Sequence, residues 1–420
     1  MGSEFWKQVL TLLSGSLLAQ IISVAFLPIL SRLYMPEAFG VFGFFIAVVA
    51  VIVVIINGGY ELTIMLPEKE AEADLLTSLS FRLAHVISGI LLLLLLLFGG
   101  KILSWADLES LNFWHLLLPL SIWMEGMAQA LSFRLNRAKA YKALSIAKLI
   151  RSILTALLSL GLAFVFEGFE GLLMGFLAGQ AGMLIYSFIY FRQKIFKHKK
   201  EKDTSSLKDI ATQYVDFPRY SVVSALMNTA SKHLPFFLLP RLFNTNVSGQ
   251  FTKSDRVLNL PAVLVSMSIG RIYFEKASRA AESSPKELAQ LTKDTFLRLF
   301  LLAIPFLCVI MLWGPELFSF VLGEPWKLAG EYARCIMPWM FMVFIASPLS
   351  YLIDIKRKLQ LFLYFNLMLF WVRLVALLLG AQYLDDLGTM WAFGLSGAFM
   401  VFLQLIYLLY LGGVFSRKAS

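Results

Sequence analysis

Twelve segments of this chain are each apolar over the roughly 20 residues that a helix needs to cross the hydrocarbon layer of a membrane. A chain that crosses this layer must satisfy its own backbone hydrogen bonds, and a helix does so within one segment. The sequence therefore predicts an all-α polytopic membrane protein without a sizeable soluble domain. The segments are 8–33, 38–64, 75–99, 112–134, 144–166, 171–192, 217–240, 249–271, 291–313, 330–353, 360–381 and 390–412.

Composition supports this class, because 59% of the 420 residues are hydrophobic and 15% are charged. Soluble domains are about 45–50% apolar and about 25% charged. The net charge of +10 is explained by basic loops rather than by nucleic-acid binding, since no basic patch is interleaved with aromatic residues. Neither Cys308 nor Cys335 has metal-ligand spacing, so no metal site or disulfide is expected.

Lysine and arginine are unevenly distributed over the loops, which predicts the orientation. They cluster at 137–142, 192–202, 276–286, 356–358 and 417–418, all on the side of the termini, whereas the opposite loops carry few. By the positive-inside rule both termini are cytoplasmic. The basic stretch at the middle of the chain separates six segments from six. We expect an N-terminal six-helix bundle at 1–192, a solvated basic cytoplasmic linker at 193–216 and a C-terminal six-helix bundle at 217–420.

A short internal repeat relates the two halves. The stretch "SRLYMPEAFGVF" from Ser31 aligns with "PRLFNTNVSGQF" from Pro240, so that Arg32 pairs with Arg241 at a constant offset. Both stretches lie between the first two segments of a half. Two pseudo-symmetric halves in one orientation are typical of secondary transporters, in which the substrate site lies between the halves.

Polar residues recur at helical spacing on five segments. A charge near the membrane centre costs about 2.5–3.5 kcal/mol on insertion scales, so such stripes predict a water-filled cavity or, alternatively, buried ion pairs. On the second segment, Asn57 and Glu61 are four residues apart and are expected on one face. The other residues are Gln20, Arg82, His85, Asn228, Lys232, Lys253, Asp255, Arg256 and Asn259.

A cationic cavity suits an anionic substrate, since guanidinium groups bind phosphate through paired hydrogen bonds. The candidate phosphate-binding residues are Arg256, Lys232, Lys253, Arg82 and Arg32. Of these we favour Arg256 and expect Arg32 to anchor the outward rim, while Lys253 could instead extend to the membrane surface. Glu61, Asp255 and His85 are candidates for ion coupling, although Asp255 could be the counter-ion of Arg256. Gln20, Asn57, Asn228 and Asn259 are the expected polar lining.

Five motifs resemble one family along nearly the whole chain. They are "LSRLYMPEAFGVF", "GGYELTIMLPEKEAEA", "FRLNRAKAYKALSIAKLIRS", "YVDFPRYSVVSALMN" and "GQFTKSDRVLNLPAVLVSMSIGRIYFEKAS". The chain resembles the polysaccharide transporters, including Wzx-type O-antigen flippases, of the multidrug/oligosaccharidyl-lipid/polysaccharide exporter superfamily. The resemblance implies two six-helix bundles forming a V around a central cavity, with Glu61 and Arg256 in that cavity. The second turn of the repeat lacks the Pro-Glu of the first.

The resemblance also implies a function. The chain is expected to be a flippase of the bacterial inner membrane that moves undecaprenyl-diphosphate-linked oligosaccharide, for lipopolysaccharide O-antigen or another polysaccharide, to the periplasmic leaflet by alternating access. No GxxxxGK[ST] loop is present, so an H⁺ or Na⁺ gradient rather than ATP is the expected driving force, with no other cofactor. Membrane lipids and other polysaccharide-assembly proteins are the further expected partners.

Two other functions were weighed against the flippase. A multidrug efflux pump of a sister branch would export cationic drugs and would need an anionic cavity. A membrane enzyme such as a polymerase or ligase would need a large outward loop, whereas 100–111 and 314–329 are short. Paired carboxylates at Asp385 and Asp386 are typical of a solvated turn. The sequence therefore favours a protein that is not an enzyme.

Overall fold

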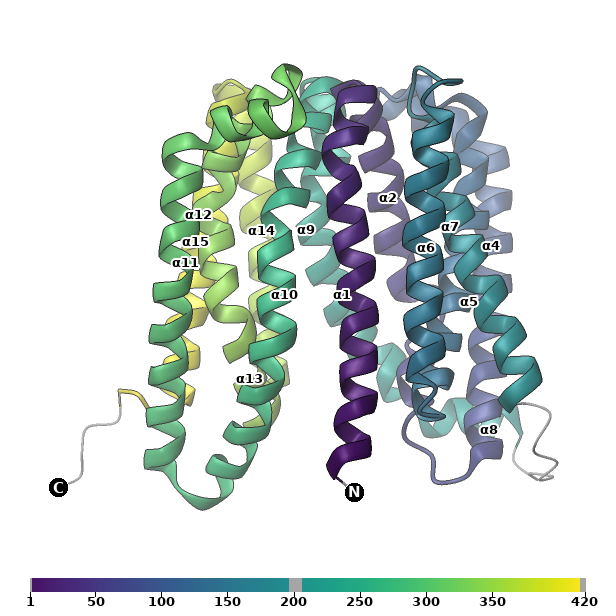
Figure 1. Ribbon diagram of the computed structural model, residues 1–420, viewed down its shortest axis with the longest axis vertical. Coiled ribbons are helices and arrows are strands. Elements are labelled where there is room, and N and C mark those ends of the chain that lie inside the picture. Colours follow the sequence, from purple (N-terminus) through teal and green to yellow (C-terminus); the bar gives the residue numbers. More distant parts are fainter. Residues whose placement is uncertain (1, 196–205, 416–420) are drawn as a thin grey trace. The chain divides into compact units, whose positions relative to one another are not determined.

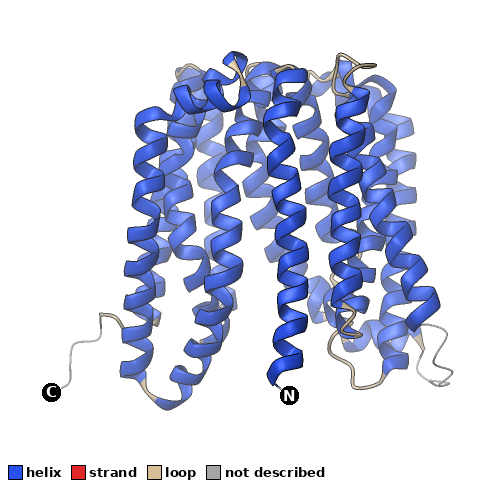
Figure 2. Cartoon of the chain, viewed as in Figure 1, coloured by secondary structure: helices blue, strands red, loops and turns tan. Residues whose placement is uncertain are grey.

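The computed structural model describes residues 2–195 and 206–415, which form helices and connecting turns with no strand among them (Figure 2). Twelve of the described helices have 20 or more residues, which confirms the predicted all-α architecture. Ten of these twelve helices are long and apolar enough to cross a membrane, and the other two are α9 and α10. The long helices are α1 (Gly2–Leu33), α2 (Pro36–Ile56), α4 (Glu70–Trp105), α5 (Leu118–Arg137), α6 (Tyr141–Leu162), α7 (Glu170–Tyr190), α9 (Val222–Leu242), α10 (Thr245–Ser283), α11 (Pro285–Leu322), α12 (Lys327–Leu349), α14 (Leu359–Tyr383) and α15 (Asp386–Leu411).

Contacts divide the chain into two compact units, unit 1 (Met1–Thr229) and unit 2 (Ala230–Ser420), with the division inside α9. Unit 1 contains α1 to α8, and unit 2 contains most of α9 and all of α10 to α15 (Figure 1). Each unit therefore holds six long helices when α9 is counted with unit 2. Short helices lie between the long helices along the chain: α3 (Tyr60–Thr63), η1 (Glu109–Leu117), η2 (Phe191–Ile195), α8 (Leu207–Gln213), η4 (Phe217–Ser221), η5 (Glu324–Trp326) and α13 (Tyr351–Ile355).

Small residues let the helices of unit 1 pack closely. A β-carbon at Gly175 of α7 would lie 2.2 Å from the Ser159 hydroxyl of α6, and one at Gly179 would lie 2.1 Å from the Thr155 hydroxyl. Only glycine allows two backbones to approach so closely, which is a common way to associate helices in lipid. This packing accounts for Ser159 and Thr155 of α6.

The repeated turn is present in both units but is built differently. In unit 1, Pro36 is the first residue of α2, a position where its missing N–H costs nothing. In unit 2, the Asn244 side chain caps α10 by accepting a hydrogen bond from the Val247 N–H at 2.9 Å. The second turn therefore forms without the Pro-Glu sequence, and Arg32 and Arg241 each lie in the last turn before it.

The second predicted segment, 38–64, is not one continuous helix. Helix α2 ends at Ile56, and Gly58 and Gly59 follow with φ of 60° and 76° before α3 begins. These left-handed conformations suit glycine and break the helix. The prediction that Asn57 and Glu61 share one helical face is therefore wrong, and Glu61 lies beyond the end of the spanning helix.

Part of the predicted linker is folded into unit 1, so the expectation of a wholly solvated linker is wrong for this part. Helix α8 contacts α4, and its Ile210 is buried in a cluster with Tyr60 and Ile64. The Tyr60 hydroxyl donates a hydrogen bond to the Ala211 carbonyl at 3.1 Å. Residues 196–205 of the linker lie outside the described residues.

Candidate functional site

A fully buried arginine, Arg373 of α14, contacts residues of three other helices in unit 2. Its guanidinium carbon is 3.7 Å from the ring centre of Trp339 and 4.2 Å from that of Phe393. One nitrogen, Nη1, donates to the Ser231 carbonyl at 3.4 Å. A guanidinium held between aromatic faces is stabilised by cation–π attraction, which is strongest where water is absent. Arg373 thus joins α14 to α12, α15 and α9.

Asp255 of α10 is the carboxylate that interacts electrostatically with Arg373, and it also interacts with Lys232 of α9. Its Oδ1 accepts a hydrogen bond from the Asn259 Nδ2 at 2.8 Å, one helical turn away. We call Lys232, Asp255, Asn259 and Arg373 the charge cluster. The structure therefore gives Asp255 partners on two other helices, rather than its sequence neighbour Arg256.

The predicted cations of α9 and α10 have different surroundings. Lys232 and Arg256 are exposed, whereas Lys253 is completely buried with its Nζ 4.8 Å from the Trp326 ring centre. The neighbouring Ser254 explains this burial, because its hydroxyl donates to the Ala329 carbonyl at 2.5 Å and turns this face of α10 toward α12. Lys253 therefore does not extend to the surface, whereas Lys232 and Arg256 are each exposed.

In unit 1, Glu61 is buried at 4% exposure, and its Oε2 has no hydrogen-bond partner among the described residues. It lies outside the spanning segments Pro36–Ile56 and Glu70–Trp105. Burial raises the pKa of this carboxyl to about 7, partly offset by its own backbone amide. Asn57 is also buried, but it serves packing, because its Nδ2 donates to the Gly126 carbonyl of α5 at 3.0 Å. Glu61 can therefore gain or lose a proton near neutral pH.

The remaining predicted residues differ in exposure. Arg82 and His85 are exposed on α4, and the His85 Nδ1 lies 2.6 Å from the Phe81 carbonyl oxygen, so its ring is satisfied locally. Arg32 is exposed in the last turn of α1. Gln20 and Asn228 are half-buried. The described residues contain no group of three or more His, Cys, Asp or Glu placed to hold a metal ion.

An ion-pair network of α4 and α5 was missed by the sequence analysis. Arg134, only 1% exposed, pairs through Nη2 with Glu70 at 2.9 Å and through Nε with Asp74 at 2.7 Å. Arg137 pairs with the same Glu70 at 3.1 Å and donates to the Ile64 carbonyl at 3.1 Å. This network fixes the helices that flank α3, which carries Glu61. Acidic residues at 68–74 and arginines at 134–137 were the available signal, but pairing them requires knowing that α4 and α5 are neighbours.

A second missed network connects α5, α6 and α7. Arg151 Nη1 lies 2.8 Å from Glu125 Oε1, and the Gln180 Nε2 donates to Glu125 Oε2 at 2.8 Å. The Ser121 hydroxyl completes it by donating to the Gln180 side-chain carbonyl at 2.8 Å. All of these charges are paired, so the network has a structural role in holding three helices together.

Comparisons with known proteins give the family. The sequence profile of the family described as polysaccharide biosynthesis protein matches residues 29–330. No curated protein sequence matches the chain. Among solved structures, an inward-facing multidrug resistance MATE family transporter of the MOP superfamily has a TM-score of 0.76 at 13% identity, covering 97% of this chain and 96% of its own.

Two further solved structures have the same fold. Lipid II flippase MurJ, in an inward closed conformation, has a TM-score of 0.69 at 14% identity, covering 94% of this chain and 86% of its own. A MOP superfamily transporter from Pyrococcus furiosus has a TM-score of 0.62 at 12% identity, with 97% and 95% covered. The chain therefore belongs to the polysaccharide biosynthesis protein family and is a multi-pass membrane protein with the fold of the MOP superfamily transporters.

Proposed function

We propose that the protein is a flippase that moves undecaprenyl-diphosphate-linked oligosaccharide from the cytoplasmic to the periplasmic leaflet of a bacterial inner membrane. The observation that carries this proposal is the excess of positive charge on α9, α10 and α14. Lys232, Arg256 and Arg373 are cations, and Asp255 interacts electrostatically with Lys232 and Arg373 only. The family description and the fold shared with a lipid II flippase support a lipid-linked substrate.

The proposed mechanism assigns each part of the substrate to a matching environment. Arg256 and Lys232 bind the diphosphate, because both are exposed and a guanidinium offers paired donors to phosphate oxygens. The oligosaccharide stays in water and the lipid tail stays in the membrane. The two bundles alternate between access to one leaflet and to the other, with both termini cytoplasmic. No covalent bond is made or broken in this cycle, so the protein is proposed to act without enzymatic activity.

We assign ion coupling to Glu61 and propose H⁺ as the coupling ion. Its carboxyl is buried, lacks a partner for Oε2, and has a pKa close to neutral pH because of burial. Asp255, in contrast, interacts with two cations and accepts a hydrogen bond from Asn259, so we propose that it is a structural counter-ion. Release of the proton from Glu61 would leave a buried charge, which favours a rearrangement that admits water.

The competing function is export of cationic drugs. The MATE family transporter described above shares the fold at 13% identity, and this similarity concerns architecture. An excess of positive charge at the charge cluster repels a cationic drug and attracts a phosphate. The charge balance therefore favours the anionic lipid over the drug.

Leaflet-resolved transport by the purified protein tests the proposal. Proteoliposomes would contain a defined undecaprenyl-diphosphate oligosaccharide, and the fraction reaching the opposite leaflet would be measured over time. We expect Arg256→Ala to reduce the rate at least tenfold and Arg32→Ala to reduce it less. A larger loss from Arg32→Ala would reverse the assignment. Binding of organic cations without retention of lipid diphosphate would support the efflux pump instead.

Coupling is tested in the same vesicles with an imposed pH gradient. We expect Glu61→Gln to abolish the dependence of transport on the gradient and Asp255→Asn to retain it. If Glu61→Gln, Asp255→Asn and the double variant all transport as well as the wild type under the gradient, coupling through a carboxylate would be abandoned.

A further inference from the structure

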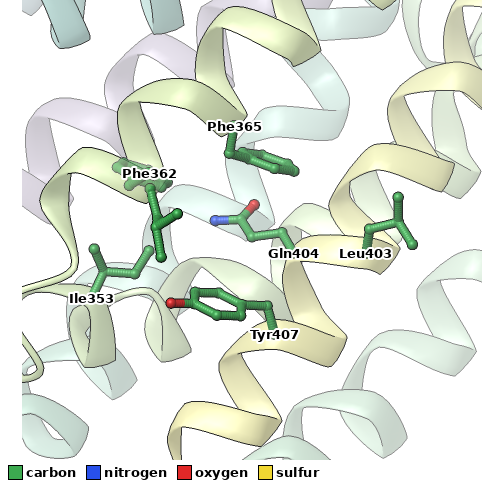
Figure 3. Close-up of a pocket in the computed structure, with 7 residues that line it drawn as sticks. Ile353, Phe362, Phe365, Leu403, Gln404 and Tyr407 are labelled. Atoms are coloured by element: carbon green, nitrogen blue, oxygen red, sulfur yellow. The ribbon is translucent and has the colours of Figure 1, made fainter.

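Three short stretches of unit 2 enclose an apolar pocket with a volume of about 210 Å³ (Figure 3). Its walls are Ile353 of α13, Phe362 and Phe365 of α14, and Leu403 of α15, with Leu361 at the edge. Leu361 and Leu403 are 50% and 41% exposed, so the pocket is open to the surface of unit 2. In a membrane such a surface faces hydrocarbon, and the pocket has the width and chemistry for a section of one lipid chain.

Two polar side chains also line the pocket. Gln404 and Tyr407 lie one turn apart on α15, and Figure 3 shows Gln404 extending toward the aromatic rings of Phe362 and Phe365. A wholly apolar ligand would leave the Gln404 amide without a hydrogen-bond partner in the pocket, which is unfavourable. The occupant that fits has a hydrocarbon chain and a polar group close to it.

A basic turn, Lys356–Lys358, borders the pocket directly. The Lys358 N–H donates to the carbonyl of Ile353 at 2.9 Å, and the Phe362 N–H donates to the carbonyl of Lys358 at 3.3 Å. Both of these partners are pocket residues. The turn thus joins the two helices that form one wall, and its position is fixed relative to the pocket.

The charges of this turn favour an anion. Arg357 and Lys358 are exposed, Lys356 is half-buried, and Asp354 is the one acidic residue of the adjoining α13. Three positive charges therefore face one negative charge. Basic residues next to a membrane helix attract anionic lipid headgroups.

We propose that the α13–α14–α15 pocket and the basic turn together form a binding site for an anionic phospholipid. One acyl chain occupies the pocket, the Gln404 amide lies near the ester groups, and the phosphate contacts Arg357 and Lys358. The site is separate from the charge cluster, and the proposed transport cycle does not use it. Its occupant comes from the surrounding membrane, to which the pocket is open.

The test uses the intact purified protein in a neutral detergent. Its melting temperature is measured with phosphatidylglycerol, an anionic lipid, or with zwitterionic phosphatidylethanolamine. A ligand that binds only the folded state raises the melting temperature, by about 2–4 °C for a moderately saturated site in a domain of this size. We expect this rise with phosphatidylglycerol and less than half of it with phosphatidylethanolamine.

Two charge-matched variants separate the site from general electrostatics. Arg357→Gln/Lys358→Gln removes two exposed cations beside the pocket. Lys139→Gln/Lys142→Gln removes two exposed cations of unit 1, one in the turn between α5 and α6 and one in the first turn of α6. The turns are alike in backbone, since Arg357 and Lys139 have φ of 53° and 56°. We expect the first variant to lose at least half of the phosphatidylglycerol effect and the second to keep it.

A third variant tests the pocket itself. Leu403→Trp places a large ring at the open edge while leaving the basic turn unchanged, and we expect it also to lose the phosphatidylglycerol effect. Equal losses in the two charge variants, or an unchanged effect in Leu403→Trp, would overturn the proposal. A rise with undecaprenyl diphosphate but none with phosphatidylglycerol would overturn it as well, because the pocket would then hold the transport substrate. Loss of the flippase assignment would leave these expectations unchanged.

Discussion

Replacing Arg373 with methionine would remove a buried charge while keeping a long apolar chain between Trp339 and Phe393. The guanidinium lies 3.7 and 4.2 Å from the two ring centres, where cation–π attraction is worth about 2 kcal/mol in the absence of water. The hydrogen bond to Ser231 is long at 3.4 Å and adds little. Asp255, which is half-buried, would also lose a cation with which it interacts, and a pairwise interaction of this kind is worth about 0.5–3 kcal/mol. We expect a net loss of about 3 kcal/mol.

The assay is a double-mutant cycle with Asp255→Asn, read out as melting temperature in detergent. For a domain of the size of unit 2, a loss of about 3 kcal/mol lowers the melting temperature by roughly 6–12 °C. If the two charges interact as the structure indicates, the double variant is less destabilised than the sum of the single variants, by about 2 kcal/mol or roughly 4–8 °C. Arg373→Lys is the control that keeps the charge but loses the planar stacking, and it is expected to fall between wild type and Arg373→Met.

Additive effects would refute the reasoning. If the double variant melts where the sum of the single variants predicts, to within about 0.5 kcal/mol, Asp255 and Arg373 do not interact measurably. The assignment of Asp255 as a structural counter-ion would then fail, and Asp255 would return as a candidate for ion coupling.

Three further predictions concern unit 1. Arg134→Ala removes the buried cation of Asp74 and leaves Glu70 paired with Arg137 alone, and it is expected to cost about 3–5 kcal/mol. A fall in melting temperature below 2 °C would contradict this. Gly171→Ala would place a β-carbon 2.1 Å from the Tyr34 hydroxyl and is expected to lower the free energy of unfolding by about 1–3 kcal/mol. The control Gly89→Ala has open space around the new β-carbon and is expected to be neutral or stabilising, so equal changes in melting temperature would exclude close packing as the cause. Burial raises the pKa of Glu61 from 4.5 to about 7, so its contribution to the free energy of unfolding is complete below pH 4.5 and is lost as the pH rises to 7, by up to about 3 kcal/mol. Glu61→Gln should therefore reduce the pH dependence of the melting temperature over this range. If the melting temperatures of wild type and variant change in parallel with pH, Glu61 does not titrate there.

The extent of the helices was largely predictable from hydropathy, since each crossing must be apolar and satisfy its own backbone. The main error was at 38–64, where hydropathy continues through Asn57 to Ile64 although the backbone does not. Two glycines with positive φ break the helix there, and an apolar window does not detect a backbone conformation. That break places Glu61 in a separate turn, where it is buried without a partner for Oε2.

The candidate site was predictable in part. Helical spacing on α9 and α10 identified Lys232, Asp255 and Arg256, because a charge in an apolar helix is conspicuous. The same spacing could not distinguish the buried Lys253 from the exposed Arg256, since both lie on one helix and differ only in which neighbour covers them. Arg373 was overlooked as a single charge on α14, a segment with no polar stripe.

The sequence by itself determined that the chain crosses a membrane many times, that two halves repeat a turn, and that cations outnumber anions at the polar stripes. These properties depend on composition and on spacing along one helix. Only the tertiary structure decided which charges are partners, because Asp255 and Arg373 interact although they lie on helices far apart in the chain. Packing between Trp339 and Phe393 holds Arg373 in its position. The tertiary structure likewise decided that the basic turn at 356–358 borders an apolar pocket, since the residues of α15 that complete the pocket lie more than forty positions later in the chain.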